Sequence, residues 1–278
     1  MNSRTSKQLV WKCFVYIILA FFAILMIGPF IWMISTSFKT MQEAFLFPPT
    51  LIPETFMWEN YVTVWTAAPF GRFYLNSIFV SVAITLGQLI TCSLGAYAFA
   101  RLSFPGRDKL FILYIATMMI PFQVTMIPLF FVMREFGWID TFYALIIPLI
   151  FSPYGTFLLR QFFKTIPREL EDSVRIDGGG YLVCFFRIIL PLSKPALATL
   201  GMFVFLFSWN NFLWPLIITN TTSMKTLPLG IAFFQGQFHV AWNLIMAAGT
   251  IAMIPLLVIY LFMQRFFIEG ITLTGLKS

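Results

Sequence analysis

Residues 171–191 read EDSVRIDGGGYLVCFFRIILP and place acids, bases and three consecutive glycines in the middle of an apolar chain. The surrounding segment 160–194 holds ten of the 29 charged residues. Long apolar runs flank it on both sides. The chain otherwise avoids charge and offers no recognisable catalytic group nearby, so the role of this segment decides how the rest of the sequence is interpreted.

The first half of this segment has the signals of a short helix. Thr165 is suited to cap an N-terminus, and Pro167 fits an early helical position. Glu169, Glu171 and Asp172 then lie near the positive end of the helix dipole, where acids are favourable. We therefore expect a charged helix that begins near residue 165.

Three glycines, Gly178–Gly180, separate this helix from an apolar second one. Glycine permits a tight reversal that side chains would obstruct. The second, apolar helix should cover Tyr181–Leu190 and be ended by Pro191 and Pro195 before the fifth span. Leu170 and Val174 lie four residues apart and share a face of the first helix. We interpret the pair as an element that docks onto another protein; the alternative is a solvated loop that only connects two membrane spans.

The composition predicts a membrane protein. Of 278 residues, 59% are hydrophobic and 10% are charged, whereas about 25% are charged in a typical soluble domain. Six runs without charge are each long enough to cross a hydrocarbon core of roughly 30 Å. We predict an all-α protein with six transmembrane helices in a single domain over residues 1–278, with a helix-turn-helix loop, 160–194, between spans four and five. The predicted spans are 13–38, 73–100, 110–133, 141–162, 195–219 and 241–264.

The basic residues predict the orientation. With the N-terminus inside the cell, the inner segments hold 14 Lys and Arg residues and the outer segments hold four. Because inner loops carry an excess of basic residues, both termini and segment 160–194 should be cytoplasmic. This topology accounts for the net charge of +7, so no nucleic-acid partner is expected. Cys13, Cys92 and Cys184 are far apart in the sequence, and we expect no disulfide.

Motifs for catalysis and cofactor binding are missing from the sequence. There is no HExxH and no GxSxG, and the single histidine, His239, is interpreted as an interfacial side chain. We therefore predict no catalytic residue, no metal site and no cofactor bound by this chain. A phosphate-binding GxxxxGK[ST] is also missing, so ATP and Mg²⁺, if they drive the protein, must be bound by partner subunits.

The residues alone leave transport alternatives open. All eleven acids fall outside the six runs, and a charge at the bilayer centre costs about 2.5–3.5 kcal/mol. Proton coupling is therefore disfavoured more firmly than sodium coupling, whose sites can be built from carbonyl groups. A passive channel or ion-coupled carrier remains the alternative to a permease driven by another chain. A membrane enzyme is disfavoured because the catalytic groups are missing.

The helix pair also carries a family resemblance. Permeases of ATP-binding cassette importers have the pattern E-A-A-x-x-x-G, then nine residues, then I-x-L-P. Four positions match at the required spacing: Gly178, Ile188, Leu190 and Pro191. Asp172 stands in place of the Glu, and Ser173 and Val174 stand in place of the two Ala residues. Glu171 is a neighbouring acid available for the same role.

The resemblance extends over nearly the whole chain and is closest to the sugar-importing, maltose-permease-like branch. It includes GPFIWMISTSFK, NSIFVS, GAYAFARLSFPGR, MMIPFQVTMIPLF, FLFSWNNFLWPL and QRFFIEGITLTGLKS. It implies a permease subunit in the bacterial plasma (inner) membrane that provides half of a path for a sugar-like solute. The partners it implies are a homologous second permease, two cytoplasmic ATPase subunits and an extracytoplasmic solute-binding protein.

In that family the hinged helix lies in a groove of the ATPase, and ATP-driven closure of the ATPase dimer switches the permease pair from inward-facing to outward-facing. The resemblance therefore implies a set of ATPase-coupling residues in this sequence. They are Glu171, Asp172, Ser173, Val174, Arg175, Asp177, Gly178, Ile188, Leu190 and Pro191. The solute itself is left open among sugars, polyols, glycosides and sugar phosphates.

Polar and aromatic side chains at membrane depth are the only guide to the solute path. Sugars are commonly held by amide hydrogen bonds and by aromatic faces, so the group on the fifth span is the best candidate. The candidate path residues are Gln88, Gln123, Trp209, Asn210, Asn211 and Trp214. The alternative for each is a hydrogen bond between helices, worth about 0.6–2 kcal/mol in lipid.

Overall fold

Helices make up most of the structure, a computed structural model that describes residues 3–236 and 240–275. Within those ranges the only strand-like pairing is an isolated bridge between Gln235 and Val240, so the predicted all-α class is confirmed. The chain packs as two compact units. Unit 1 comprises residues up to 68 together with 231–253, and unit 2 comprises 69–230 together with the residues from 254 onward.

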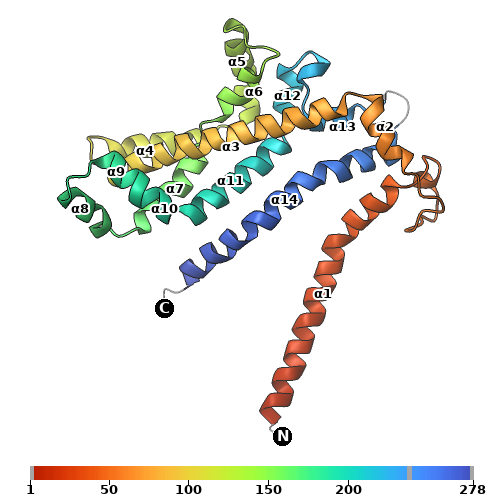
Figure 1. The fold of residues 1–278 in the computed structure, drawn as a ribbon, viewed down its shortest axis with the longest axis horizontal. Helices are drawn as coiled ribbons and strands as arrows, with labels where there is room; N and C mark the ends of the chain where they lie inside the picture. The colour runs from red at the N-terminus through yellow and green to blue at the C-terminus, as the bar shows by residue number, and fades with distance from the viewer. Residues whose placement is uncertain (1–2, 237–239, 276–278) are drawn as a thin grey trace. The chain divides into compact units, whose positions relative to one another are not determined.

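The helices of unit 1 are α1, η1 and α2, and α14 begins in this unit (Figure 1). Their bounds are Ser3–Ser37 for α1, Glu43–Phe45 for η1, Glu59–Ala67 for α2 and Trp242–Gly275 for α14. Asn60 joins them, because its side-chain amide donates to the carbonyl oxygens of Ser37 and Lys39, each at 2.8 Å. Its carbonyl oxygen accepts from the amide of Asn243 at 3.0 Å.

Unit 2 begins with helices α3 to α7. Their bounds are Phe70–Arg101 for α3, Arg107–Ala116 for α4, Thr117–Met119 for η2, Phe122–Glu135 for α5, Phe142–Ile146 for α6, Ile147–Leu149 for η3 and Pro153–Thr165 for α7. The rest of the unit contains α8 (Glu169–Ile176), α9 (Tyr181–Cys184), the π-helical turn η4 (Phe185–Ile189), α10 (Leu190–Leu192), α11 (Lys194–Trp209), α12 (Leu213–Ile218), η5 (Thr222–Met224) and most of α13 (Leu227–Ala232).

Three described helices are long and apolar enough to cross a membrane unbroken. They are Trp11–Ser37, Phe70–Arg101 and Trp242–Gln264. Three further pairs qualify only if each bent pair counts as one span, with bends of 98° between η2 and α5, 41° between η3 and α7, and 76° between α10 and α11. By length and composition, the described residues therefore contain three candidate spans, or up to six if each bent pair is one span.

The breaks follow the prolines. Pro121 immediately precedes α5, Pro153 begins α7, and Pro195 lies in the first turn of α11. Proline has no N–H to continue a helix and clashes with the preceding turn, so each of these positions ends one helical segment and starts another. The sequence predicted six spans from continuous apolar runs. The described residues contain three continuous candidate spans and three bent pairs.

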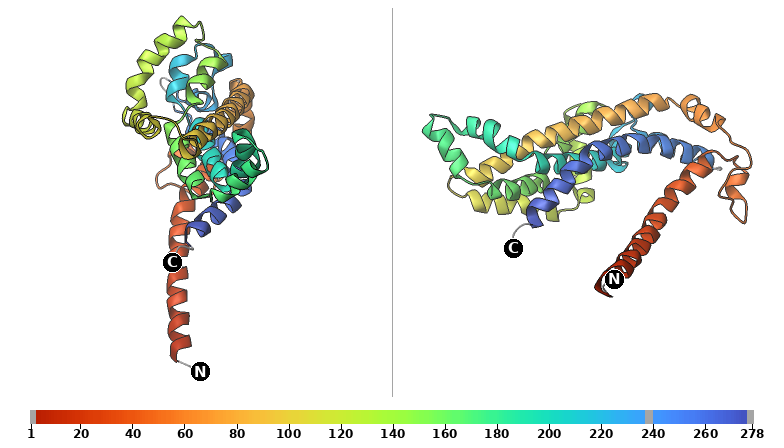
Figure 2. Two further views of the ribbon diagram at one scale, coloured as in Figure 1. Left: turned by 90° about the vertical axis from the view of Figure 1, so that its left-hand side faces the viewer. Right: turned by 60° about the horizontal axis from the view of Figure 1, so that its bottom comes forward.

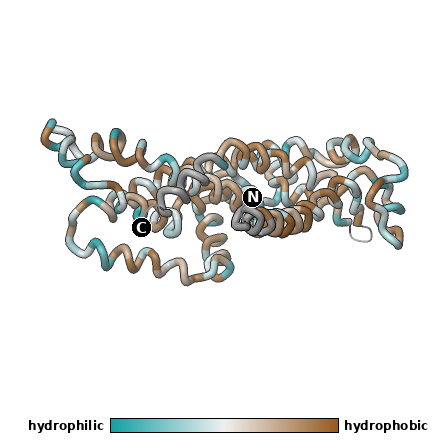
Figure 3. The backbone as a smooth tube through the Cα atoms, turned by 90° about the horizontal axis from the view of Figure 1, so that it is seen from below, coloured by the Kyte–Doolittle hydropathy of each residue, from teal (hydrophilic) through white to brown (hydrophobic). Residues whose placement is uncertain are grey.

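Helix α3 is the centre of unit 2, and α7 and α11 pack along it. Figures 1 and 2 show the long α3 flanked by these two helices, and Figure 3 shows hydrophobic residues along the helices with hydrophilic residues at their ends and loops. The core between them includes Ile84, Leu159 and Leu200, all at most 2% exposed. Gly155 allows the close approach, because a Cβ there would lie 2.8 Å from the sulfur of Cys92.

Helix α3 also satisfies the backbone at the break between η3 and α7. The amide of Gln88 donates to the Leu149 carbonyl at 2.7 Å, and the hydroxyl of Thr91 donates to the Ile150 carbonyl at 2.5 Å. These carbonyls lie where the helix is interrupted, and lipid could not bond to them. The polar side chains of α3 therefore make the break tolerable in a membrane.

We predict that Gly155→Ala destabilises the protein by about 1–3 kcal/mol, because the added methyl overpacks a filled core. It would also lie 3.2 Å from a methyl of Leu200. Gly28→Ala is the matched control, since no heavy atom lies within 4 Å of its added Cβ. Melting of the detergent-solubilised protein, followed by size-exclusion chromatography, should show a lower midpoint for Gly155→Ala only; equal midpoints would contradict this packing.

Candidate functional site

Helix α8 ends in a glycine turn with a defined hydrogen-bond pattern. The N–H of Gly178 donates to the Arg175 carbonyl at 3.0 Å, and the N–H of Gly179 donates to the Val174 carbonyl at 2.8 Å. This is the Schellman arrangement, which requires a left-handed residue, and Gly178 has φ +82°. A Cβ on Gly179 would lie 2.5 Å from a methyl of Val174. Gly178 is thus required by its backbone conformation, and Gly179 is required because a side chain there would clash with Val174.

The start of α8 differs from the sequence prediction. Thr165 does not cap α8; it is the last residue of α7, and its hydroxyl donates to the Phe162 carbonyl at 2.7 Å. Pro167 lies between the helices, and Arg168 precedes the first residue of α8. The prediction of the cap was wrong because α7 continues through Thr165, where the hydroxyl bonds to its own helix instead of the next one.

The second helix also continues further than predicted. Helical structure runs from Tyr181 through α9, η4 and α10 to Leu192, so it passes Pro191 and ends before Pro195. In η4 the N–H of Leu190 bonds to the Phe185 carbonyl, five residues back. The wider π turn lies just before the proline, whose missing N–H an ordinary α-helical ladder would require. A proline therefore stays inside the helical stretch.

A buried ion pair attaches α8 to the end of α3. Nε of Arg101 lies 3.0 Å from Oε1 of Glu171, and the two side chains are only 4% and 5% exposed. Nη2 of Arg101 also donates to the carbonyls of Phe163 at 2.6 Å and Ile166 at 2.5 Å, at the end of α7. One guanidinium thus joins three helices. Arg101 is a residue that the sequence reasoning missed; its only signal was a charge directly after an apolar run.

The other predicted coupling residues divide by exposure. The exposed ones are Asp172, Ser173, Arg175, Asp177, Gly178 and Pro191, while Val174, Ile188 and Leu190 are partly buried. Asp172 and Arg175 line a polar pocket of about 210 Å³ between α8 and the residues after α3. Arg175 also lies over the ring of Tyr181, 4.8 Å from its centroid. Asp172, Arg175 and Asp177 are therefore the exposed charges that the motif places on α8 and at its end.

The predicted path residues occupy different surroundings. Gln88 is bonded to Leu149, as described above, and Trp214 is fully buried with Nε1 donating to the Ala144 carbonyl at 2.9 Å. Both bonds are of the helix-to-helix kind that was the alternative for these residues. Asn210 and Gln123 are exposed, and the amide of Asn210 donates to the Leu206 carbonyl of its own helix at 2.8 Å.

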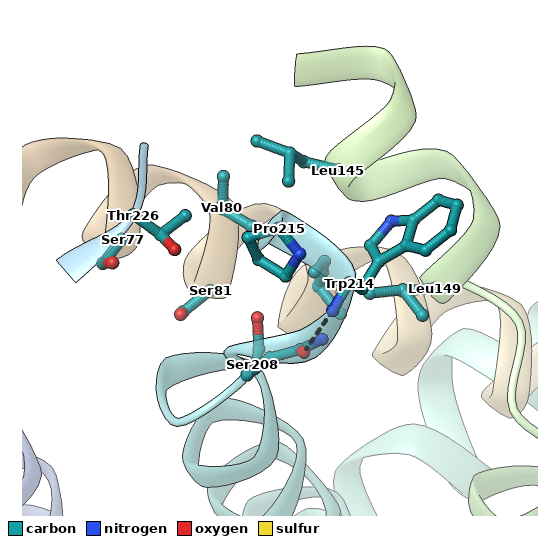
Figure 4. Close-up of a pocket in the computed structure, with 11 residues that line it drawn as sticks. Ser77, Val80, Ser81, Leu145, Leu149, Ser208, Trp214, Pro215 and Thr226 are labelled. Atoms are coloured by element: carbon teal, nitrogen blue, oxygen red, sulfur yellow. Dashed lines mark hydrogen bonds between the residues drawn. The ribbon is translucent and has the colours of Figure 1, made fainter. Parts of the chain in front are cut away.

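Two further path residues lie near a small pocket (Figure 4). Asn211 and Trp214 line it, and Oδ1 of Asn211 accepts from the Trp214 backbone N–H at 3.4 Å. The hydroxyls of Ser81, Ser208 and Thr226 face this space and have no hydrogen-bond partner among the residues that the structure describes. Trp209 lies outside it, buried against Tyr74 with ring centroids 5.7 Å apart. The structure thus does not bring all six predicted residues together.

Asp140 fixes the segment after α12. Its backbone N–H donates to the Ile218 carbonyl at 2.9 Å, and its Oδ1 accepts from the N–H groups of Asn220 at 2.9 Å and Thr221 at 3.1 Å. Asp140 has φ +60°, which few residues other than Gly, Asn and Asp adopt readily. Partial burial would raise the pKa of Asp140, but these hydrogen bonds outweigh it and hold the pKa below its ordinary value. His239 lies outside the described residues.

Comparison with known proteins identifies the class. Residues 83–272 match the family described as the inner membrane component of binding-protein-dependent transport systems. The chain belongs to this family. It is a permease subunit of such a transport system, and this membership decides against the passive-channel and ion-coupled alternatives.

Individual relatives agree with this assignment. The chain is 35% identical over its full length to the whole of the arabinooligosaccharides transport system permease protein AraQ of Halalkalibacterium halodurans. It is 39% identical, over 83% of its length and 85% of the relative, to the sn-glycerol-3-phosphate transport system permease protein UgpE of Yersinia pestis. The fold is that of a chain in the crystal structure of a bacterial ABC transporter that imports alginate, with a TM-score of 0.83, 23% identity, and coverage of 96% of this chain and 99% of the other.

We predict that acidification weakens the attachment of residues 219–221 through Asp140. A carboxylate with a lowered pKa stabilises the fold above its unfolded pKa, near 3.9, and this stabilisation is lost as pH falls through the folded value. Asp140→Asn keeps an acceptor and tolerates the backbone conformation, so it isolates the charge. It should cost about 1 kcal/mol or less at pH 7, since solvent partly screens the group.

Thermal melting of both proteins from pH 7 to pH 3 measures this effect. The difference between the wild type and Asp140→Asn should shrink as pH falls below about 4. A difference that stays constant over this range would show that the carboxylate charge plays no part in holding the segment.

Proposed function

We propose that this chain forms half of the translocation pathway of an ATP-driven importer for a sugar or sugar-like solute. The names of the relatives, which refer to arabinooligosaccharides and sn-glycerol 3-phosphate, support a polyhydroxylated solute. The transporter that contains the structural neighbour imports alginate, an acidic polysaccharide, which supports the same class. The pocket hydroxyls of Ser81, Ser208 and Thr226 have the chemistry to bond such a solute or its water, since each can donate and accept.

The proposed topology has six spans with both termini in the cytoplasm. Three continuous helices and three bent pairs supply up to six crossings, and in the third pair we assign the crossing to α11 and the segment before it to the cytoplasmic loop. The excess of basic residues on the assigned inner side supports the orientation. Under this topology α8 lies in the cytoplasm, and the segment around Asp140 and residues 219–226 lies outside. The two regions contact opposite ends of α3, the first through Arg101 and the second through Asn76, which supports the assignment of one to each side.

The proposed partners are a second, homologous permease, two cytoplasmic ATPase subunits and an extracytoplasmic solute-binding protein. The family description and the crystallised complex of the alginate transporter with its periplasmic protein support this assembly. The chain carries no phosphate-binding motif, so we assign ATP and Mg²⁺ to the ATPase subunits and no cofactor to this chain. ATP is then hydrolysed by the ATPase subunits, and their movement is transmitted to this chain.

The observation that carries the proposal is the construction of α8. It is a short charged helix that ends in a fixed glycine turn, and its exposed surface includes Leu170 at 41% and Ile176 at 86%. Large apolar side chains beside exposed charges are typical of a surface that another protein covers. We propose that the ATPase subunit binds α8, and that closure of the ATPase dimer moves it and switches the pathway between inward-facing and outward-facing states.

We predict that Gly178→Val abolishes solute uptake while the protein still inserts in the membrane. A β-branched residue is strained at φ +82°, so the turn that fixes the end of α8 should change. Gly180→Ala is the matched control, because Gly180 has negative φ and no heavy atom within 4 Å of an added Cβ. Uptake into vesicles that contain the complete complex, normalised to permease content, measures the effect.

The same preparation tests the assembly. Purification of this chain in mild detergent should recover the ATPase subunits with the wild type and with Gly180→Ala, and less of them with Gly178→Val. Normal uptake by Gly178→Val at normal expression would refute the role of α8. Full transport by this chain without any ATPase subunit would refute the proposed function.

A further inference from the structure

Two neighbouring acids on α8 have opposite surroundings. Both line the polar pocket beside α8, but Glu171 is 4% exposed and pairs with Arg101, whereas Asp172 is exposed. Both were assigned to ATPase coupling from the sequence. A side chain that is buried within its own chain cannot also contact another protein without leaving that position, so the two acids must have different roles.

The buried pair lies at a junction of three helices. Besides its ion pair with Glu171, the guanidinium of Arg101 donates hydrogen bonds to the carbonyls of Phe163 and Ile166, at the end of α7 and just after it. One turn earlier on α3, the hydroxyl of Tyr97 donates to the Tyr181 carbonyl at the start of α9, at 3.0 Å. The end of α3 therefore holds both helices of the pair and the end of α7.

Few other contacts fix α8. Its remaining side chains are exposed apart from the partly buried Val174, and the sulfur of Cys184 makes only a long contact, 3.8 Å, to the Glu171 carbonyl. Removing one partner of a buried ion pair leaves the other charge buried and unpaired, which is strongly unfavourable. The pair with Arg101 is therefore the main constraint on the position of α8 relative to α3 and α7.

We propose that Glu171 is a positioning residue, which transmits displacement of α8 to α3 and α7 through Arg101, and that Asp172 is the acid presented to the ATPase. This inference rests on the proposed function and specifies how its coupling helix acts. Helix α3 also bonds to the break between η3 and α7 through Gln88 and Thr91. A displacement of the Arg101 end of α3 would therefore reach this break.

The test compares Glu171→Gln with Asp172→Asn, its matched control, in the complete complex reconstituted in lipid. Glu171→Gln should retain the ATPase subunits and their ATP hydrolysis, but solute taken up per ATP should fall roughly tenfold or more. Amide hydrogen exchange of residues 169–177 should rise by a similar factor in Glu171→Gln. Asp172→Asn should leave this exchange unchanged and weaken retention of the ATPase instead.

The double variant Arg101→Met/Glu171→Leu provides the test if Glu171→Gln does not insert. An apolar pair of similar volume removes both charges together, so it should restore slow exchange of α8. Uptake is not a readout for this variant, because Met cannot donate to the carbonyls of Phe163 and Ile166. Exchange of α8 as fast as in a variant that lacks only one of the two charges would overturn the proposal. Wild-type exchange and uptake by Glu171→Gln would also overturn it.

Failure of this inference differs from failure of the proposed function. If the wild-type chain retains no ATPase subunit, the coupling role of α8 is refuted. If the wild type retains the ATPase and Glu171→Gln loses it as Asp172→Asn does, with exchange of α8 unchanged, Glu171 is a contact with the ATPase and only the positioning role is refuted.

Discussion

A backbone carbonyl in lipid has no water to bond with, and this constraint governs unit 2. Breaks at prolines interrupt two of the apolar runs, before α5 and before α7, and leave such carbonyls where the helices break. At the break before α7 the donors come from α3, through Gln88 and Thr91. The polar residues of this apolar helix therefore have a structural task before any functional one. These donors bond the end of η3 to one continuous helix, and α7 and α11 pack along the same helix, so α3 is the central support of the unit.

The same helix ends in the charge that organises the α8 region. Arg101 is the last residue of α3, and its guanidinium forms an ion pair with Glu171 of α8 and donates to the Phe163 carbonyl near the end of α7. Near the other end of α3, the amide of Asn76 donates to the carbonyls of Ser223 and Lys225 at 2.8 and 2.9 Å. One helix thus contacts both the surface proposed for the ATPase and the segment proposed to lie outside. A rigid element bonded at both ends is suited to pass movement from one side of a membrane to the other.

Local patterns predicted what depends on local physics. Charge-free runs predicted helices in an all-α chain, and the glycines after Asp177 predicted a reversal that the structure contains, because a left-handed residue at that point needs glycine. The sequence did not predict that α7 extends through Thr165 or that a helical stretch continues through Pro191. Both outcomes depend on how far a helix extends, which is decided by packing against neighbouring helices. The pairing of Arg101 with Glu171 joins residues far apart in sequence, so no local pattern indicated which acid would be buried.

The π turn η4 lies between Gly178 and Pro191 and affects how the helices on its two sides are aligned. Each residue of a helix rotates the next by about 100°. A turn that closes after five residues therefore sets the side on which Phe185 and Ile189 are buried while Phe186 remains exposed. A π turn contains one residue more than an α turn, so it takes up one extra residue in this helical stretch. The interval between Gly178 and Pro191 therefore includes a residue whose only task is to keep the buried faces before and after the turn in line.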